Sequence, residues 1–152
     1  MIAEKTSIRG KQTYYMKQKL ITFSVILLFA CAGCFSNKTY TEYFNMGLDY
    51  AEQGNYTEAI VCYKKALEIN PNEAVAYYYM GIAYVNLGNH AEAIGSYQKA
   101  LDIDPNYAEA YVNMGYSYGQ MGNHTEALFC YRKAAQLGNK DALIWLNEIG
   151  DK

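Results

Sequence analysis

The sequence predicts an all-α fold, a right-handed α-solenoid of three helix-turn-helix units followed by a C-terminal capping helix. Three segments, starting at Tyr43, Tyr77 and Tyr111, align without a gap and with one constant spacing. Within each segment, apolar and small residues recur with helical spacing, and a Gly-Asn pair separates two such stretches. One pair of helices cannot bury both of its faces alone, so the units are expected to stack.

Each unit contains two stripes of small and apolar residues. In the first unit, the stripe of the first helix lies at i, i+3, i+4 and i+7 and consists of Tyr43, Met46, Gly47 and Tyr50. The second helix carries a stripe of Ala59, Tyr63 and Ala66. Gly54 and Asn55 lie between the two helices, and glycine tolerates the left-handed conformation that ends a helix. The unit is therefore expected to be two antiparallel helices joined by a tight turn.

These residues and their period resemble the tetratricopeptide repeat, with tyrosine where that family usually has tryptophan or phenylalanine. The resemblance covers about residues 40–141 of a domain expected at 40–152. Pro71 and Pro105 close the first two units, whereas Asn139 stands where the third would have proline. Trp145 follows Tyr111 by one further period, which identifies the capping helix as the first helix of a shortened fourth unit. The expected units and capping helix cover about 40–73, 74–107, 108–141 and 142–150.

An uncharged run, from Leu20 to Phe35, precedes the repeats. It is shorter than the roughly 20 apolar residues that a membrane-spanning helix needs. A basic segment that begins at Met16 comes before it, and small residues follow its apolar part, as in a secretory signal. The run resembles a bacterial lipoprotein signal peptide, whose lipobox ends in a lipidated cysteine at the cleavage site. Cys34 is the favoured lipidation site because Ala32 and Gly33 precede it, and Cys31 is the alternative.

The resemblance divides the N-terminal region into an upstream extension at 1–15, a signal peptide at 16–33 and a tether at 34–39. Translation is expected to begin at Met16, and the alternative is a start at Met1 with a long basic segment. The competing interpretation is an uncleaved signal anchor, which would allow the repeat domain to face the cytoplasm.

The charge distribution argues against a nucleic-acid partner. Five of the 13 basic residues and one of the 15 acidic residues precede Cys34. The remainder carries eight basic and 14 acidic residues, a net formal charge of −6. A phosphate backbone would require a basic stripe that this region lacks.

The sequence predicts no catalytic residues, metal site or cofactor. His90 and His124 lie one period apart at equivalent turn positions, about 10 Å apart in a stacked solenoid and too far to share a zinc ion. Cys62 and Cys130 occupy equivalent positions two units apart, beyond the reach of a disulfide. We therefore expect a protein that is not an enzyme.

The resemblance implies a concave, peptide-binding face made by the first helix of each unit. By family position, its predicted lining comprises Phe44, Asn45, Leu48, Tyr78, Tyr79, Ile82, Asn86, Val112, Asn113, Tyr116 and Gln120. The neighbouring family positions add two acids, Glu52 and Glu109, and no Lys or Arg. Asparagine amides could pair with the backbone of an extended peptide, and tyrosines could supply rigid contact area.

Some tetratricopeptide domains clamp the C-terminal carboxylate of chaperones with Lys, Asn and Arg. This sequence has Phe44, Leu48, Tyr79 and Glu109 in their place, and only Asn113 is polar and of similar size. A carboxylate clamp is therefore not expected.

Together these features predict a membrane-anchored lipoprotein that acts as an adaptor or scaffold in the cell envelope, facing the periplasm or cell surface. Its expected partner is a peptide or protein in the envelope. Because residues 35–39 span at most roughly 17 Å, the domain would lie close to the membrane.

Overall fold

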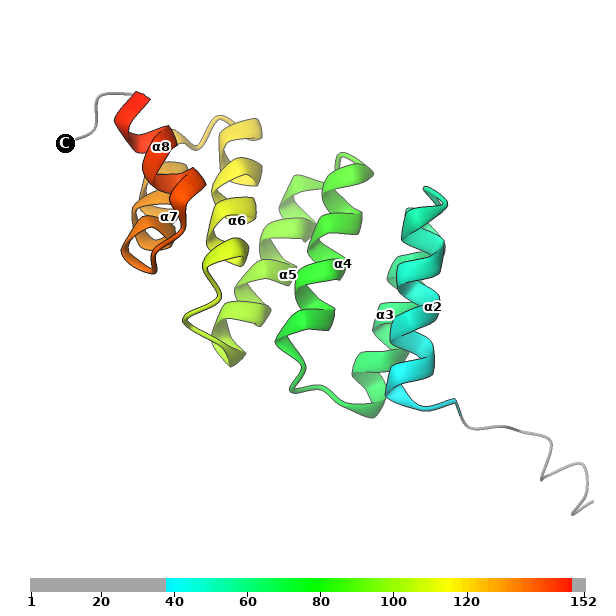
Figure 1. Ribbon diagram of the computed structural model, residues 1–152. Coiled ribbons are helices and arrows are strands. Elements are labelled where there is room, and N and C mark those ends of the chain that lie inside the picture. The colour runs from blue at the N-terminus through cyan, green and yellow to red at the C-terminus, as the bar shows by residue number, and fades with distance from the viewer. Residues whose placement is uncertain (1–37, 149–152) are drawn as a thin grey trace, which may run out of the picture. The chain divides into compact units, whose positions relative to one another are not determined.

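The structure is a computed structural model that describes residues 38–148 (Figure 1). The expected signal peptide, Cys31, Cys34 and most of the tether lie outside the described residues. Within the described range every regular element is an α-helix. The helices are α2 (Tyr40–Glu52), α3 (Tyr56–Ile69), α4 (Ala74–Asn86), α5 (His90–Ile103), α6 (Ala108–Gln120), α7 (His124–Gln136) and α8 (Lys140–Glu148). The predicted all-α solenoid of stacked helix pairs is confirmed.

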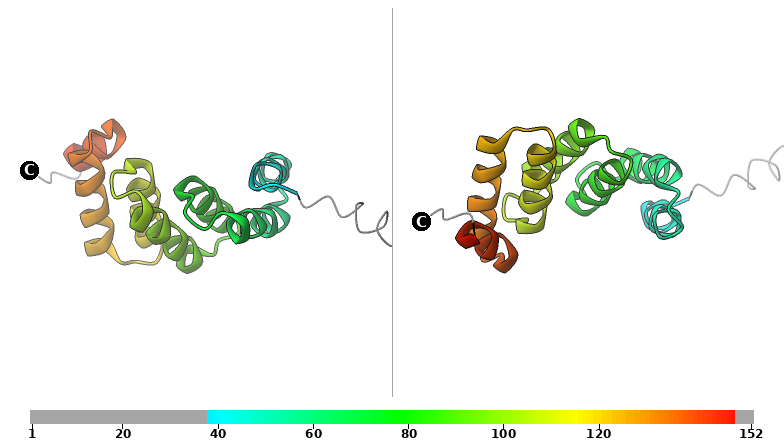
Figure 2. Two further views of the ribbon diagram at one scale, coloured as in Figure 1. Left: turned by 90° about the horizontal axis from the view of Figure 1, so that it is seen from below. Right: turned by 90° about the horizontal axis from the view of Figure 1, so that it is seen from above.

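The helices form two rows. Helices α2, α4 and α6 lie in front in Figure 1, and α3, α5 and α7 lie behind them. Figure 2 shows that the stack bends toward α2, α4, α6 and α8, which therefore lie on its concave side. We call α2, α4 and α6 the inner row and α3, α5 and α7 the outer row.

The turn inside each unit depends on a glycine with positive φ. Gly54 has φ +77°, in the left-handed region that costs glycine little, and Gly88 and Gly122 repeat this conformation. The amide of Asn55 then donates to the carbonyl oxygen of Tyr50 at 2.8 Å, which satisfies one of the last carbonyls of α2. The Gly-Asn pairs therefore end the inner helices as the sequence predicts.

Glycine also allows the two helices of a unit to approach closely. A Cβ atom added at Gly81 would lie 2.5 Å from the ring of Tyr97, and one added at Gly47 would collide with Tyr63 in the same way. Tyr63 and Tyr97 are 0% and 1% exposed and fill the centres of the first two units. These rings and their glycines position the inner row against the outer row.

Helix α8 begins at Lys140, two residues before the expected start at 142. The α7–α8 connection contains Gly138 with φ +88°, so it repeats the Gly-Asn turn found inside the units rather than the proline-containing link between them. The side-chain oxygen of Asn139 accepts a hydrogen bond from the amide of Ala142 at 2.9 Å. Trp145 stacks on Tyr131 with a centroid distance of 4.1 Å, so α8 covers α7.

None of the helices between residues 38 and 148 is long and apolar enough to cross a membrane.

Candidate functional site

Five aromatic rings form a continuous series of contacts along the inner row, and we call them the aromatic ladder. Its members, in spatial order, are Tyr40, Phe44, Tyr79, Tyr78 and Tyr107. Successive ring centroids lie 5.7, 5.7, 5.5 and 4.8 Å apart. All five rings are half-buried, so each keeps part of its surface accessible. The ladder connects α2, α4 and the start of α6.

The buried tyrosines of the outer row support the ladder from behind. Phe44 lies 5.8 Å from Tyr63, and Tyr78 lies 6.0 Å from Tyr97, measured between ring centroids. Burial raises the pKa of the Tyr78 and Tyr107 phenols, so both stay neutral near pH 7. The ladder is therefore a set of neutral rings fixed in place before any partner arrives.

One hydrogen bond fixes the ladder to α6. The side-chain amide of Asn113 donates to the phenolic oxygen of Tyr78 at 3.0 Å. Of the other two predicted amides, Asn86 donates to the Ile82 carbonyl oxygen of its own helix at 2.9 Å, and Asn45 is exposed. The amides of Asn113 and Asn86 are thus hydrogen-bonded within the chain, whereas Asn45 is exposed to solvent.

The structure distributes the predicted groove residues over three environments. Phe44, Tyr78 and Tyr79 belong to the ladder. Leu48 and Ile82 are half-buried against the two hydrophobic clusters, and Val112 and Asn113 are half-buried as well. The exposed members of the predicted set are Asn45, Asn86, Tyr116 and Gln120.

Two ladder residues, Tyr40 and Tyr107, are absent from the predicted groove. Tyr107 lies in the link before α6, one period after Glu73 in the equivalent link before α4. Tyr40 precedes Phe44 by four residues, a spacing that places both side chains on one face of a helix and so predicts the position of Tyr40. The helical pattern does not extend to Tyr107.

Charge is distributed unevenly between the two rows. The inner-row helices contain four carboxylates, Glu42, Asp49, Glu52 and Glu109, and no Lys or Arg. The outer-row helices contain five acids and five bases, the bases being Lys64, Lys65, Lys99, Arg132 and Lys133. The inner row therefore has a formal charge of −4, whereas the outer row is neutral.

Carboxylates lie close to both ends of the ladder. The charge of Glu73, in the link before α4, contributes to the raised pKa of Tyr40 after the larger effect of burial. Glu109 acts in the same way on Tyr78 and Tyr107, and Asp104 acts on Tyr107. The electrostatic environment of these rings is therefore negative.

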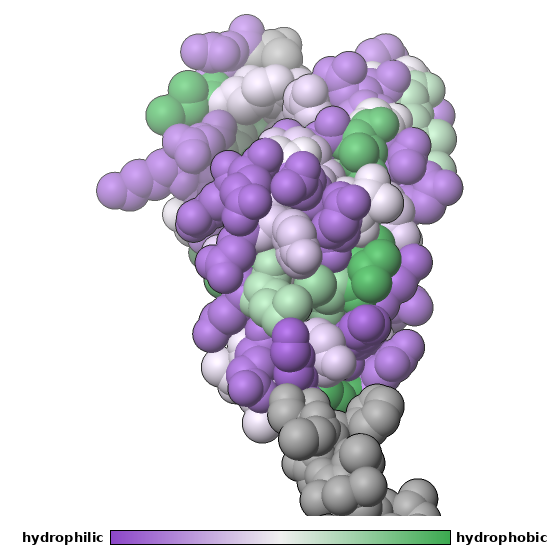
Figure 3. All heavy atoms as spheres, turned by 90° about the vertical axis from the view of Figure 1, so that its right-hand side faces the viewer, coloured by the Kyte–Doolittle hydropathy of each residue, from purple (hydrophilic) through white to green (hydrophobic). Residues whose placement is uncertain are grey.

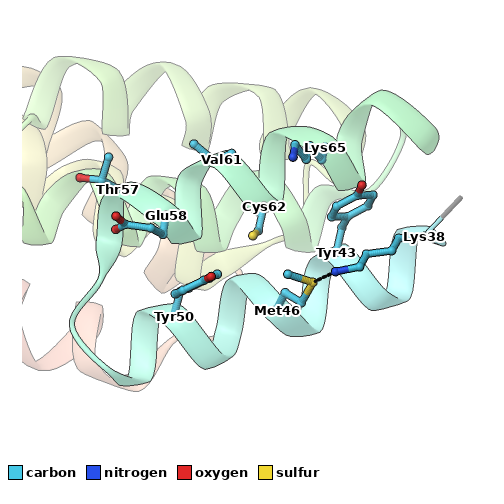
Figure 4. Close-up of a pocket in the computed structure, with 9 residues that line it drawn as sticks. All are labelled: Lys38, Tyr43, Met46, Tyr50, Thr57, Glu58, Val61, Cys62 and Lys65. Atoms are coloured by element: carbon cyan, nitrogen blue, oxygen red, sulfur yellow. Dashed lines mark hydrogen bonds between the residues drawn. The ribbon is translucent and has the colours of Figure 1, made fainter. Parts of the chain in front are cut away.

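A separate cavity of about 330 Å³ lies at the N-terminal end of the described stack. Figure 3 shows this end of the molecule, where a green apolar area is bordered by purple polar residues. In Figure 4, Tyr43, Met46 and Tyr50 of α2 lie opposite Glu58 and Cys62 of α3. The ammonium group of Lys38 donates to the sulfur of Met46. The lining consists of Lys38, Tyr43, Met46, Tyr50, Thr57, Glu58, Val61, Cys62 and Lys65.

Internal repetition explains this cavity. In the second unit the residues equivalent to Tyr43, Met46 and Tyr50 are Tyr77, Met80 and Tyr84, which pack in the first core cluster with residues of α3. The cavity is thus the surface that a preceding unit would cover. Burial raises the pKa of the Cys62 thiol, so this cysteine is not an activated nucleophile.

The remaining candidate residues for chemistry are dispersed. Cys62 and Cys130 are both buried free thiols, and burial raises the pKa of Cys130 to about 11. His90 is half-buried beside Tyr116, whereas His124 is exposed. Among residues 38–148, no group of three or more His, Cys, Asp or Glu side chains could hold a metal ion.

Comparisons with known proteins agree with this fold. The family model described as TPR repeat matches residues 47–88 and 83–122, and the model described as Tetratricopeptide repeat matches 108–138. A search of curated proteins finds no match.

Solved structures give a similar result. A crystal structure of MamA is 30% identical with a TM-score of 0.65; the match covers 68% of this chain and 61% of that one, less than two thirds of its length. The first TPR of Spaghetti (RPAP3) bound to the HSP90 peptide SRMEEVD is 27% identical with a TM-score of 0.69, covering 74% and 90%. An NMR structure of the first TPR domain of human RPAP3 is 27% identical with a TM-score of 0.68, over the same shares. This chain belongs to the tetratricopeptide repeat family, whose members are generally interaction modules without catalytic activity.

Proposed function

We propose that this protein is a non-catalytic adaptor that binds an extended peptide or a protein segment along its inner row. The aromatic ladder is the observation that carries this proposal, because it is a preformed surface that extends from α2 across α4 to the start of α6. The RPAP3 domain with bound HSP90 peptide provides a precedent for peptide binding by a similar domain.

The physical advantage of such a surface is preorganisation. Tyrosine offers a large contact area with few rotatable bonds, and residues of this type are enriched in binding hot spots. Ladder rings already fixed by Tyr63, Tyr97 and Asn113 lose little conformational entropy when a partner binds. Exposed Asn45, Tyr116 and Gln120 would add adaptable polar contacts.

A matched pair of exposed aromatic residues tests this proposal. Tyr116 of α6 is 46% exposed on the inner row, and Phe129 of α7 is 56% exposed on the outer row. In cross-linked pull-downs with the full chain, Tyr116→Ala should reduce recovery of the partner that the unmodified chain recovers, and Phe129→Ala should not. The reverse pattern would assign binding to the outer row and contradict the proposal.

We also propose that the protein is a lipoprotein of the cell envelope, anchored by a lipid on Cys34, with Cys31 as the alternative site. The support is the sequence from the basic segment at Met16 through the uncharged run to Ala32 and Gly33. Two acyl chains on the cysteine would give stable anchoring, and the partner would then be an envelope protein near the membrane.

The alternative is an uncleaved signal anchor. It is favoured by the fact that neither cysteine lies in a standard lipobox: Cys31 precedes Ala32-Gly33-Cys34, and Phe29 precedes Ala30-Cys31. The intact mass and N-terminal sequence of the membrane-extracted protein distinguish the two. A chain that starts at Cys34 or Cys31 with a diacylglyceryl group supports the lipoprotein. A chain that retains residues 16–33 and no lipid supports the anchor.

A further inference from the structure

We infer that the inner row selects a cationic peptide, one whose Lys or Arg side chains lie over the aromatic ladder and between its flanking carboxylates. This inference rests on the proposed function, because it specifies the chemistry of the partner that the inner row would bind.

The first observation is the charge of the surface. None of the three inner-row helices contains a Lys or Arg, and Glu73 and Asp104 lie in the links before α4 and α6. Charged groups across an interface are arranged so that positive meets negative, which guides encounter and excludes partners of the wrong sign. Glu42 is engaged by Thr39 at the start of α2, and Asp49 lies beside Met46 and Tyr50 at the end of the stack. The acids at concave positions are Glu52 and Glu109, and no Lys or Arg of the inner-row helices compensates them, which favours a positively charged partner.

The second observation is the pairing of rings and carboxylates. Glu73 influences Tyr40 at one end of the ladder, and Glu109 influences Tyr78 and Tyr107 at the other. An aromatic face attracts a cation through its quadrupole, and a nearby carboxylate adds an ion pair to the same ligand group. A guanidinium or ammonium group makes both interactions, whereas a neutral amide makes a weaker contact with the ring and forms no ion pair.

The third observation is that the chain already uses this chemistry on its other tyrosines. The ammonium of Lys65 lies 5.5 Å from the ring centroid of Tyr43, and Lys99 lies 5.5 Å from Tyr77 one unit later. Lys64 lies 6.0 Å from the ring centroid of Tyr84. Within residues 38–148, the cation–π contacts involve the rings of Tyr43, Tyr77, Tyr84 and Phe129 and none of the five ladder rings. The lysines of the outer row therefore make cation–π contacts with rings that face the outer row. The ladder rings remain available for cations from a partner.

The proposed charge preference is opposite in sign to the net charge of the peptide bound to the RPAP3 neighbour, SRMEEVD, which has three acidic residues and one arginine. An acidic peptide on this inner row would meet Glu73, Asp104 and Glu109 and would be repelled. Nucleic acid and other polyphosphates would be repelled for the same reason.

Three synthetic peptides of equal length test the inference. Each has the same Gly-Ser scaffold with several identical guest residues, which are Arg, Gln or Glu, and each carries a fluorescent label. Binding to the full chain in a neutral detergent is measured by fluorescence anisotropy at low and high salt, with empty micelles as the blank.

We expect the Arg peptide to bind about tenfold more tightly than the Gln peptide, with the difference shrinking at high salt. Glu109→Gln should weaken Arg-peptide binding by about two- to fivefold, as expected for one exposed ion pair. The matched control is Glu126→Gln, an exposed carboxylate in the first turn of outer-row helix α7, which should leave binding unchanged.

The other outcomes separate the two proposals. Equal binding of the Arg and Gln peptides, or equal effects of Glu109→Gln and Glu126→Gln, would overturn charge selection and leave peptide binding intact. Tightest binding of the Glu peptide would overturn the inference in favour of acidic-peptide recognition. Binding of none of the three would contradict both the inference and the use of the inner row as a peptide site.

Discussion

The inner and outer rows have the same number of helices and nearly equal length, but they differ in what they bury and in the charge they carry. Outer-row helices α3 and α5 bury six and five residues, including the fully enclosed rings of Tyr63 and Tyr97. Outer-row helix α7 buries three residues, and inner-row helices α2, α4 and α6 bury one, four and four, none of them aromatic. Charges of both signs balance on the outer row, whereas the inner row has only acids.

This difference indicates a division of labour within each repeat. In the first two units, the second helix supplies the tyrosine that fills the centre of the unit, so substitutions there should affect stability. The first helix holds aromatic surface against that tyrosine while leaving part of it accessible, so substitutions there should affect binding. Tyrosine therefore contributes to stability on the outer row and to the accessible aromatic surface on the inner row.

The largest effect should come from removing a central tyrosine. Tyr97→Ala should lower the free energy of unfolding by about 3–5 kcal/mol, because it removes a large ring that is 1% exposed and leaves a cavity between two units. Tyr116→Ala, on the exposed part of the inner row, should cost less than about 1 kcal/mol. Urea denaturation followed by circular dichroism measures both, and similar losses would refute the division between the rows.

Raising the pH should destabilise the protein through its buried outer-row groups. Burial raises the pKa of Cys130 from 9.0 to about 11 and that of Tyr63 from 10.0 to about 12. Because the unfolded chain loses these protons at lower pH than the folded one, their contribution is complete below pH 9 and is lost as the pH rises through the folded pKa values. With allowance for screening by solvent, stability should fall by about 1–3 kcal/mol between pH 9 and 11.

The matched control is the variant Cys130→Ala, whose stability should fall less steeply over the same pH interval. An identical pH dependence in the two proteins would show that the buried thiol does not contribute.

Glycine-to-alanine substitutions should have opposite effects in two places. Gly81→Ala would place a Cβ atom against the enclosed ring of Tyr97 and should cost about 1–3 kcal/mol. Gly95→Ala, in the exposed middle of α5 with open space around its Cα, should instead stabilise the helix by about 0.5–1 kcal/mol. Thermal melts of the two variants should therefore shift in opposite directions. A gain in Gly81→Ala would mean that the helices of the unit are not in close contact.

A small effect on stability should come from loss of the hydrogen bond that fixes the ladder to α6. Tyr78→Phe removes the acceptor of the Asn113 amide and should cost about 1 kcal/mol while leaving the ring series intact. Arg-peptide binding should then change little, because the ring face is retained. A large loss of binding in this variant would show that the hydroxyl group, rather than the ring, contacts the partner.

The fold can be predicted from the sequence because the three units repeat the same physical solution. Gly47, Tyr63 and their counterparts in the second unit specify helix contact, and the Gly-Asn pairs specify the turns. The start of α8 predicted from the repeat period is two residues late. The period assumes a proline-containing link after the third unit, whereas the chain has a Gly-Asn turn at Gly138 and Asn139.

The candidate site can be predicted only in part. Phe44, Tyr78 and Tyr79 are predictable because they occupy regular positions on the inner helices. Tyr40 and Tyr107 lie outside the family positions that defined the predicted lining. Tyr40 is the first residue of α2, one turn before Phe44, and Tyr107 lies in the link before α6, where no helical period applies. The bond between Asn113 and Tyr78 joins two units and depends on how they stack, which the period alone does not determine.

The most direct test of the account locates the bound peptide on the full chain. An Arg peptide that carries a photoreactive benzophenone is cross-linked to the protein, and the adducts are identified by mass spectrometry. The account predicts adducts on α2, α4 and α6, close to the aromatic ladder, and their loss on competition with unlabelled Arg peptide. Adducts concentrated on α3, α5 and α7, or around the cavity formed by Tyr43, Met46 and Cys62, would contradict it.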